Sequence, residues 1–341
     1  MKSIILGCTG QIGSYFVDYL LNLGHEVYGV ARRVSTPNYK NIMHNLDNPN
    51  FYIEEGDVTD LSSLIRIFDK VKPDFIIDEA AQSQVGVSFN QPLLTIETTG
   101  VGAINVFEAM RKCCPDAKTY FAGTSELFDG LTYPQNENTP FRPKSPYGVA
   151  KLLGVEAARV YYESYGLFIC AGIQYNTESP RRGIEFVTQK IVDTVVRQVC
   201  GEDITLELGN LSTKRDWQHA KDAVKGQWLM LQQDEPKTYI LATGKTHSIY
   251  EFVNKVYQYF DIDLIWIPGK EYYNDKSLPI GLDSDGKVLV KSVSKYMRPN
   301  EVAILQGDSS KARTELGWNP QYTLDDIIKD MIESKLTEYG L

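Results

Sequence analysis

The chain has 341 residues, of which 43% are hydrophobic and 23% charged, and its net charge is −9. This length suits about two domains, and the composition is that of an ordinary globular protein with a large core. The acidic balance argues against a general nucleic-acid partner, and the lack of a run of about 18 apolar residues argues against a membrane span.

The cysteines and histidines indicate whether disulfides or a metal site are expected. The five cysteines form no C-x-x-C pair, which is typical of reduced thiols. The four histidines are scattered, so we expect no metal site. The amino terminus passes directly into a glycine-rich motif, without a segment that resembles a signal peptide. We therefore expect a cytoplasmic protein.

The first half of the chain alternates short apolar runs with stretches of helical periodicity. The predicted strands are residues 4–6, 26–30, 51–53, 75–77, 119–121 and 167–173. The predicted helices are residues 10–23, 61–71, 100–111 and 147–165. This alternation predicts an α/β fold with a Rossmann-type, doubly wound parallel sheet.

The pattern loosens after about residue 176 into helical segments mixed with short strands. We expect residues 1–175 to form mainly the dinucleotide-binding domain. Residues 176–341 would form mainly a smaller, discontinuous α/β domain for the substrate, with some chain crossing between the two. The polar residues 35–49 are expected to form an irregular loop, a candidate for packing on a neighbouring subunit.

A glycine-rich turn follows the first predicted strand and opens a helix. Such a turn lets a pyrophosphate approach the backbone, and the helix N-terminus supplies amide donors. The alternative is a purely structural turn, which the position between strand and helix disfavours. The residues predicted to contact a dinucleotide here are Gly7, Thr9, Gly10, Gln11, Ile12 and Gly13.

The end of the second strand selects between NAD and NADP. An acidic residue there would accept the ribose hydroxyl of NAD, but the chain has Arg32 and Arg33. Two guanidinium groups suit a 2′-phosphate, so we expect NADP, although a solvated basic turn is the alternative. Weaker cofactor candidates follow the third and fourth strands: Asp57, Val58, Ala80, Ala81 and Gln82.

The candidate catalytic groups follow the fifth strand. Tyr147 and Lys151 lie four residues apart on one face of a predicted helix. We expect Lys151 to lower the pKa of the Tyr147 phenol, so that Tyr147 can take a hydroxyl proton. Thr124 stands where parallel sheets place ligands. Glu126 is a second acid/base, which indicates a second proton transfer such as the elimination of water, whereas a solvated carboxylate is the commoner fate of Glu.

At these residues the chain resembles the GDP-mannose 4,6-dehydratase family of extended short-chain dehydrogenases/reductases. The resemblance covers nearly the whole length. Its motifs are Gly10-Gln11, Arg32-Arg33, Ala80-Ala81-Gln82-Ser83, Thr124-Ser125-Glu126, Ser145-Pro146-Tyr147, Glu178-Ser179-Pro180-Arg181-Arg182-Gly183, Leu208-Gly209-Asn210, Lys214-Arg215-Asp216-Trp217, His219-Ala220-Lys221-Asp222, Ala242-Thr243-Gly244 and Arg298-Pro299.

The resemblance implies a lyase that converts GDP-mannose to GDP-4-keto-6-deoxymannose, an intermediate toward GDP-fucose and other deoxysugars. Tyr147 would deprotonate the sugar 4-hydroxyl, and Glu126 would take the carbon 5 proton and assist loss of the 6-hydroxyl. A homodimer or homotetramer is also implied. The resemblance further assigns Thr177 and Arg182 to the cofactor and the following to the substrate: Ser83, Asn176, Lys190, Arg215, Arg298 and Glu301.

Four positions depart from the family pattern: Ile12, Gln84, Gly123 and Thr177. They leave open a dehydratase of a GDP-heptose such as GDP-manno-heptose. A GDP-sugar epimerase or reductase that uses only Tyr147 and Lys151 is another alternative, although Glu126 would then have no clear task. A non-catalytic nucleotide sensor is a further alternative. The complete set of Thr124, Glu126, Tyr147 and Lys151 argues against the sensor.

Overall fold

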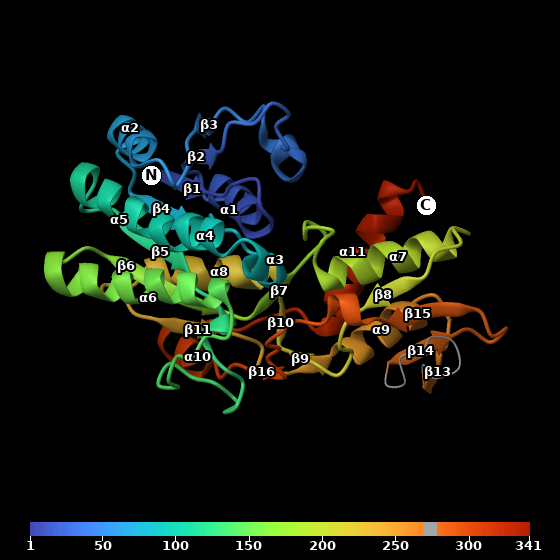
Figure 1. The fold of residues 1–341 in the computed structure, drawn as a ribbon. Coiled ribbons are helices and arrows are strands. Elements are labelled where there is room, and N and C mark those ends of the chain that lie inside the picture. The colour runs from blue at the N-terminus through green and yellow to red at the C-terminus, as the bar shows by residue number, and fades with distance from the viewer. Residues whose placement is uncertain (269–277) are drawn as a thin grey trace.

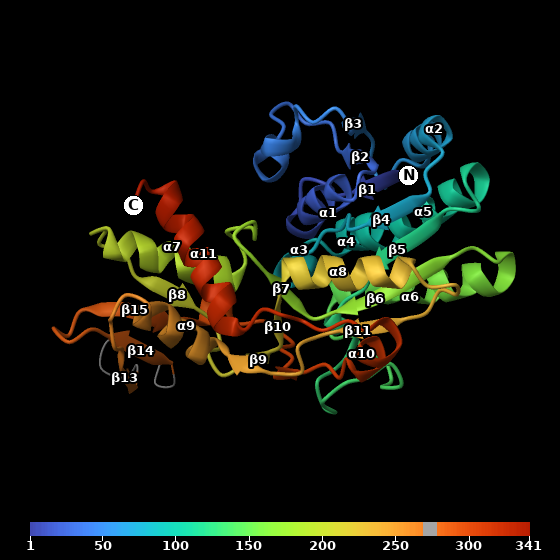
Figure 2. The same ribbon diagram turned by 180° about the vertical axis from the view of Figure 1, so that it is seen from behind.

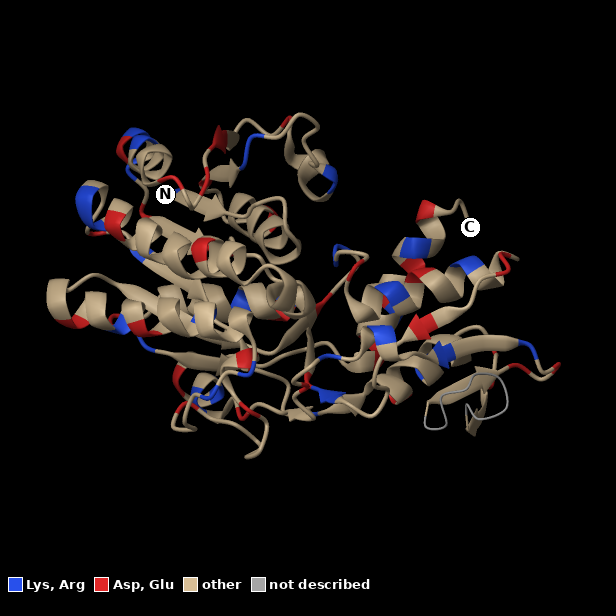
Figure 3. Cartoon of the chain, in the orientation of Figure 1, with Lys and Arg blue, Asp and Glu red and all other residues tan. Residues whose placement is uncertain are grey.

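The computed structural model describes residues 1–268 and 278–341 of the chain. Figure 1 shows two lobes, a sheet with helices on both faces formed mainly by the first half of the chain and a second lobe around α7, α9 and α11. Lysines and arginines alternate with acidic residues over both lobes in Figure 3. No described helix is long and apolar enough to cross a membrane.

A seven-stranded sheet organises the first lobe. Its strand order is β11-β6-β5-β4-β1-β2-β3, and every neighbouring pair is parallel. The predicted Rossmann-type sheet is thus confirmed. The order reverses between β1 and β4, where such sheets open a ligand crevice. The strands are β1 (Lys2–Leu6), β2 (Glu26–Ala31), β3 (Phe51–Glu55), β4 (Phe75–Asp78), β5 (Lys118–Ala122), β6 (Ile169–Gln174) and β11 (Tyr239–Leu241).

Helices cover both faces of this sheet because its strands carry apolar side chains on both sides. One core joins the sheet to α2, α5 and α6, and another joins it to α1 and α8. The helices of this lobe are α1 (Gln11–Asn22), α2 (Leu61–Val71), α3 (Val85–Asn90), α4 (Pro92–Thr95), the π-helix η2 (Ile96–Val101), α5 (Gly102–Cys113), α6 (Pro146–Tyr165), α8 (Ala220–Leu231) and α10 (Ser310–Leu316).

Helix α6 begins and ends as its sequence dictates. The Ser145 hydroxyl accepts a hydrogen bond from the Gly148 amide at 3.1 Å, which caps the helix N-terminus. Pro146 occupies the first turn, where its missing amide costs nothing. Gly166 ends the helix with φ of 69°, a left-handed conformation that glycine adopts freely. This framing holds Tyr147 at the first turn of the helix.

The second lobe is a smaller α/β unit with its own core. A four-stranded sheet of order β13-β14-β15-β8 packs there against α7, α9 and α11, while two short sheets join the lobes. Its elements are β7 (Asn176–Glu178), α7 (Val187–Val199), β8 (Leu206–Leu208), β9 (Lys214–Arg215), β10 (Trp217–His219), β12 (His247–Ser248), α9 (Ile249–Gln258), β13 (Ile265–Pro268), β14 (Pro279–Leu282), β15 (Val288–Ser292), β16 (Ile304–Leu305) and α11 (Leu324–Glu338).

The chain crosses back into the first lobe after residue 176. Strand β11 pairs with β6, and α8 packs beside α1 on the face seen in Figure 2. The first lobe therefore contains chain from both sides of the predicted boundary at residue 175. Neither β11 nor α8 was predicted as part of the sheet domain.

Residues 35–49, predicted as an irregular loop, contain the 3-10 helix η1 (Lys40–Asn45). This helix packs on α1 of the same chain. The His44 ring bonds to the Asp18 carboxylate at 2.7 Å, and the Asn41 side-chain amide donates to the Thr9 carbonyl at 3.1 Å. The segment is thus tied to the glycine-rich turn, while its contact with another subunit stays a prediction.

Candidate active site

The glycine-rich turn lies in the crevice between β1 and β4. Gly7 has φ of 77°, and a Cβ there would lie 3.1 Å from the Ala80 backbone nitrogen. A Cβ on Gly13 would lie 2.3 Å from the Gly7 oxygen. Only glycine fits these two positions. Gly10 begins α1 without a side-chain cap, so the first-turn amides of the helix are suited to a pyrophosphate.

Gln11 joins this turn to the second lobe. Its side-chain nitrogen donates to the Thr177 carbonyl at 2.8 Å, and its side-chain oxygen accepts from the Ser179 hydroxyl at 3.1 Å. Thr177 is buried, and its hydroxyl donates to the Tyr175 carbonyl at 3.1 Å. Two predicted cofactor residues therefore meet here, although both side chains serve intrachain bonds.

A cavity of about 460 Å³ opens beside the ends of β2 and β3. Arg32, Arg33 and Asp57 line it, together with Arg66, which the sequence analysis missed. Arg66 lies on α2 and donates to the Glu55 carbonyl at 2.7 Å. The Asp57 carboxylate accepts from the Thr59 amide at 2.9 Å and so shapes the loop. Three guanidinium groups around one cavity are suited to a phosphate.

The loop after β4 forms the opposite wall of the crevice. The Ala80 amide donates to the Asp78 carboxylate at 3.2 Å, and the Gln82 amide donates to the Thr99 hydroxyl at 3.1 Å. Ala81 is partly buried beside them, and Ser83 is exposed. Val58, by contrast, is buried against Gly102, so it acts through packing.

Thr124 and Glu126 lie in the 3-10 helix region η3 (Ser125–Leu127) directly after β5. The Thr124 hydroxyl accepts from the Glu126 amide at 3.2 Å, and both residues are buried. A Cβ on Gly148 would lie 2.5 Å from the Glu126 carbonyl oxygen. Glycine therefore lets α6 approach η3 closely, which brings Tyr147 to Thr124 and Glu126.

The pKa of Tyr147 is raised in this structure, whereas the sequence led us to expect a lowered one. Burial raises the pKa of its phenol to about 12, and the Glu126 charge adds to the increase. A hydrogen bond with the Thr124 side chain and the Arg182 charge oppose the increase. The lowering that we expected from Lys151 is therefore wrong for this structure, because desolvation of the phenolate outweighs the nearby positive charge.

Lys151 is buried and faces away from solvent. Its ammonium donates to the Ala122 carbonyl at 2.6 Å, at the end of β5. Burial lowers the pKa of Lys151, while Asp78 and Glu79 raise it. These two carboxyl groups come from the end of β4 and were absent from the predicted site.

A chain of alternating charges reaches Glu126 from the second lobe. The buried Arg215 bonds to Glu301 at 2.8 Å, and burial lowers the pKa of this guanidinium. Arg298 lies 3.6 Å from Glu301 and 3.9 Å from Glu126. Three residues predicted for substrate thus converge on the predicted acid/base, a proximity that sequence spacing alone did not reveal.

The remaining predicted residues lie on β7, on α7 and in the turn between them. Asn176 is partly exposed on β7. Arg182 pairs with the buried Glu178 at 3.3 Å. The Lys190 ammonium donates to the Glu207 carbonyl at 2.7 Å and lies 3.7 Å from the centre of the Tyr296 ring. Arg182 and Lys190 are thus held by neighbours within the chain.

One family departure has a local explanation. A Cβ on Gly123 would lie 2.7 Å from the Gly172 carbonyl oxygen, whose bond from the Gly123 amide is 2.8 Å long. Glycine at position 123 therefore allows the close approach of β5 and β6 just before Thr124. Gln84 precedes α3 as its N-cap residue, without a side-chain cap bond.

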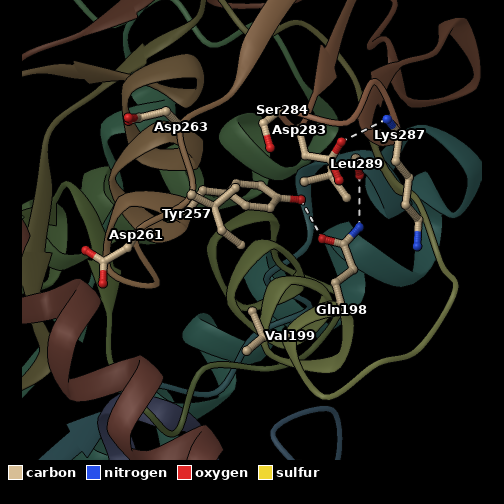
Figure 4. A pocket seen from close by; sticks show the side chains of 10 residues that line it. Gln198, Val199, Tyr257, Asp261, Asp263, Asp283, Ser284, Lys287 and Leu289 are labelled. Carbon is tan, nitrogen blue, oxygen red and sulfur yellow. Dashed lines mark hydrogen bonds between the residues drawn. The ribbon is translucent and has the colours of Figure 1, made fainter.

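A second cavity of about 480 Å³ lies in the other lobe (Figure 4). The Tyr257 hydroxyl there donates to Gln198 at 2.6 Å, and Gln198 donates to the Leu289 carbonyl at 3.0 Å. The Asp283 carboxylate accepts from the Lys287 amide at 2.8 Å. These polar groups hold the lobe together, and none of its described lining residues is a predicted site residue.

Within residues 1–268 and 278–341, no three His, Cys, Asp or Glu side chains gather in a group that could hold a metal ion. Among the charged groups near Glu126, Glu301 pairs with Arg215.

The parallel sheet, the glycine-rich turn and the Tyr147–Lys151 helix define the class of short-chain dehydrogenases/reductases. DesIV, a dTDP-glucose 4,6-dehydratase from Streptomyces venezuelae with NAD and TYD bound, shares this fold with a TM-score of 0.84 at 22% identity, over 100% of this chain and 98% of that one. A UDP-glucose 4-epimerase from Thermotoga maritima gives 0.82 at 22% identity, over 99% and 100%.

A family model described as GDP-mannose 4,6 dehydratase matches residues 4–331. The chain is 42% identical to the GDP-mannose 4,6 dehydratase of Drosophila melanogaster, over 98% of this chain and 86% of the relative. It is 41% identical to the human GDP-mannose 4,6 dehydratase, over 97% and 90%. The chain belongs to the GDP-mannose 4,6-dehydratase family, which confirms the resemblance drawn from its motifs.

Proposed function

We propose that this protein is a nicotinamide-dependent hydro-lyase that converts GDP-mannose to GDP-4-keto-6-deoxymannose and water. One observation carries the proposal: the close contact of Gly148 with Glu126 places a phenol, a hydroxyl and a carboxylate together at the carboxyl end of β5. An oxidation alone needs one acid/base group. The additional carboxylate supports elimination, and it disfavours an epimerase or reductase, in which Glu126 would have no task.

Each residue has a role that follows from its position. Tyr147 takes the proton of the sugar 4-hydroxyl, and the Thr124 hydroxyl orients the same oxygen. The resulting 4-ketone acidifies the proton on carbon 5, which Glu126 removes. Glu126 then protonates the departing 6-hydroxyl, so that water leaves. Arg298 lies 3.9 Å from the Glu126 carboxylate that makes both of these transfers.

The cofactor fits the first lobe through its glycine-rich turn and the cavity beside Arg32. A bound nicotinamide would supply the hydride chemistry for removal at carbon 4 and return at carbon 6, so that no net oxidation would occur. We propose that the turn at Gly7–Gly13 and the start of α1 hold the pyrophosphate. We propose that Lys151 and residues 80–82 would help to hold the bound dinucleotide.

We propose NADP as the cofactor because three arginines line the cavity near the ends of β2 and β3. Arg32→Ala should raise the Kd for NADP by at least about tenfold and change that for NAD by less than about twofold, since only NADP carries the 2′-phosphate. Titration calorimetry of both dinucleotides measures this difference. Lys112→Ala, an exposed change on α5, is the control. Equal losses for NADP and NAD would contradict the assignment.

The substrate diphosphate needs cations from the second lobe. We propose that Lys190 and Arg215 contact it, with Arg298 and Glu301 toward the rest of the substrate and Asn176 beside the phosphate or sugar. The support is that Arg215, Glu301 and Arg298 form one chain of charges that ends at Glu126. Guanidinium groups match phosphate oxygens, and a chain of net charge −9 needs such groups where it binds an anion.

The proposed activity has a direct test. Purified protein incubated with GDP-mannose should give a product lighter by one water, without added reductant and without net formation of NADPH. Mass spectrometry detects the loss, and absorbance of the reduced nicotinamide follows the cofactor. GDP-glucose serves as the matched substrate control. An unchanged mass for GDP-mannose, with the dinucleotide shown to be bound, would contradict the proposal.

We propose that the chain forms a homodimer or homotetramer in the cytoplasm. Exposed apolar side chains on α4, η2 and α6 support an interface there, among them Leu93, Leu94, Val101, Val149 and Leu153. The five free cysteines suit a reducing compartment. Sedimentation as a 38.5 kDa monomer would contradict the oligomer, and recovery from a membrane fraction would contradict the location.

A further inference from the structure

The turn between β7 and α7 contains an arginine, Arg181, to which the proposed function gives no role. Residues 183–185 of this turn are exposed and belong to no helix or strand. The Arg181 side chain leaves the turn and reaches α1 in the other lobe. An arginine that ties an exposed turn to the helix proposed to hold the dinucleotide requires an explanation beyond solubility.

Arg181 contacts three side chains on one turn of α1. Its guanidinium donates to the Asp18 carboxylate at 2.7 Å and to the Ser14 hydroxyl at 3.2 Å. Its central carbon lies 4.1 Å from the centre of the Tyr15 ring. The two side chains of the ion pair are only 21% and 25% exposed. A guanidinium fixed by two bonds and a ring holds its position better than a solvated ion pair does.

Ser179 provides a second link between α1 and the turn. This serine is fully buried. Its hydroxyl donates to the Gln11 side-chain oxygen at 3.1 Å and accepts from the Arg181 amide at 3.2 Å. Gln11 is the first residue of α1, at the end of the helix that suits a pyrophosphate. A ligand that restrains the start of α1 therefore restrains Arg181 through both its side chain and its backbone.

The next residues continue this series of contacts to the proposed substrate site. The Arg182 guanidinium carbon lies 3.5 Å from the centre of the Phe186 ring. Phe186 is the N-cap residue of α7, and its carbonyl accepts from the Lys190 amide at 2.9 Å. Lys190 is the cation proposed for the substrate diphosphate. Packed and hydrogen-bonded residues thus connect the start of α1 with Lys190, which is the kind of network that can carry energetic coupling.

We propose that Arg181 is a positioning residue that couples the two ligand sites, so that a dinucleotide bound at α1 strengthens binding of a nucleoside diphosphate at Lys190. Both ligands need the turn in one conformation. The ligand that binds first meets the entropic cost of ordering the turn, so the second binds more tightly, and the effect is reciprocal. In this proposal Arg181 contacts neither ligand. The inference rests on the proposed function for the identity of the two ligands, and not on the dehydration step.

Titration calorimetry with GDP, in the absence and presence of saturating NADP, measures the coupling. GDP should bind wild type at least about fivefold more tightly when NADP is present. In Arg181→Met, which keeps an unbranched stem beside Tyr15 but loses the bonds to α1, this ratio should fall below about twofold. Arg181→Lys can still pair with Asp18 and should restore part of the ratio. A merely structural role would change the Tm or both affinities and leave the ratio unchanged.

A double-mutant cycle tests whether the bond to α1 carries the effect. Asp18→Asn should lower the ratio, and adding it to Arg181→Met should lower the ratio no further, because both changes remove the same bond. Arg197→Met is the matched control, since Arg197 pairs with Glu202 at 2.6 Å at the other end of α7. Its ratio should equal that of wild type.

Hydrogen exchange tests the same coupling without the second ligand. NADP alone should slow amide exchange in residues 181–186 of wild type by at least about fivefold and change it by less than about twofold in Arg181→Met.

A ratio of one in wild type, or a wild-type ratio in Arg181→Met, would overturn the proposal even if GDP-mannose is dehydrated. A ratio that is lost in Arg181→Met, in a protein that never dehydrates GDP-mannose, would support the role of Arg181 and count against the proposed function. Failure of GDP to bind under either condition would overturn both.

Discussion

Glu126→Gln is expected to lose dehydration activity by about 10²- to 10⁴-fold while it binds the dinucleotide as wild type does. Glutamine keeps the shape of the side chain, and the amide of residue 126 can still donate to the Thr124 hydroxyl. It cannot take the proton from carbon 5 or deliver one to the departing hydroxyl. The loss corresponds to about 3 to 5 kcal/mol of activation free energy.

The partial reaction of this variant distinguishes the role of Glu126. Oxidation at carbon 4 depends on Tyr147, so Glu126→Gln should still form reduced nicotinamide in a single turnover and then stop. Stopped-flow absorbance measures the burst, and mass spectrometry measures the water loss. Glu137→Gln is the control, because this carboxylate lies in the loop between η3 and α6 and accepts the Ile240 amide at 2.8 Å. Unchanged water loss in Glu126→Gln would remove Glu126 from the mechanism.

Tyr147→Phe is expected to abolish the oxidation step itself, with a loss of about 10²- to 10⁴-fold in kcat and no burst of reduced nicotinamide. The buried phenol has a pKa of about 12, so few molecules hold the phenolate at neutral pH. The wild-type rate should therefore rise with pH as the fraction of phenolate grows. Tyr147→Phe should lose this rise together with the rate.

A second tyrosine on the same helix provides the control for Tyr147→Phe. The Tyr161 hydroxyl bonds to Glu108 at 2.9 Å on the side of α6 that faces α5. Tyr161→Phe should keep both the burst and the pH dependence, and any cost should appear only in thermal stability. If Tyr147→Phe instead retained a wild-type burst, another group would have to accept the proton of the 4-hydroxyl.

The local pattern of apolar residues was sufficient to predict most strands and helices of the first lobe. The alternation of apolar strands with amphipathic helices specifies a parallel sheet, since each helix must cover a face of it. The Ser145-Pro146 pair marked the start of α6 and thus the place of Tyr147. Strand β11 was missed because three apolar residues, Tyr239–Leu241, carry no signal of the strand with which they pair.

The sequence predicted the individual candidate residues of the site, but it did not predict which charged groups surround them. Motifs pointed to Glu126, Tyr147 and Lys151, because these residue types have known chemistry. Glu79 was missed because a carboxyl beside two alanines has no distinguishing spacing, and only its unpaired, buried oxygen sets it apart. The approach of Arg298 to Glu126 joins residues far apart in the chain, so it depends on how the lobes pack.

The amino-acid sequence by itself determined the family and the parallel α/β architecture, and it predicted the proton-transfer groups, since all of these follow from short motifs and local periodicity. Tertiary structure alone decided which charges share the crevice and the direction in which they shift the pKa of Tyr147. The reason is that desolvation and Coulomb interactions depend on burial and on distances between residues remote in the chain, and neither quantity is encoded in local spacing.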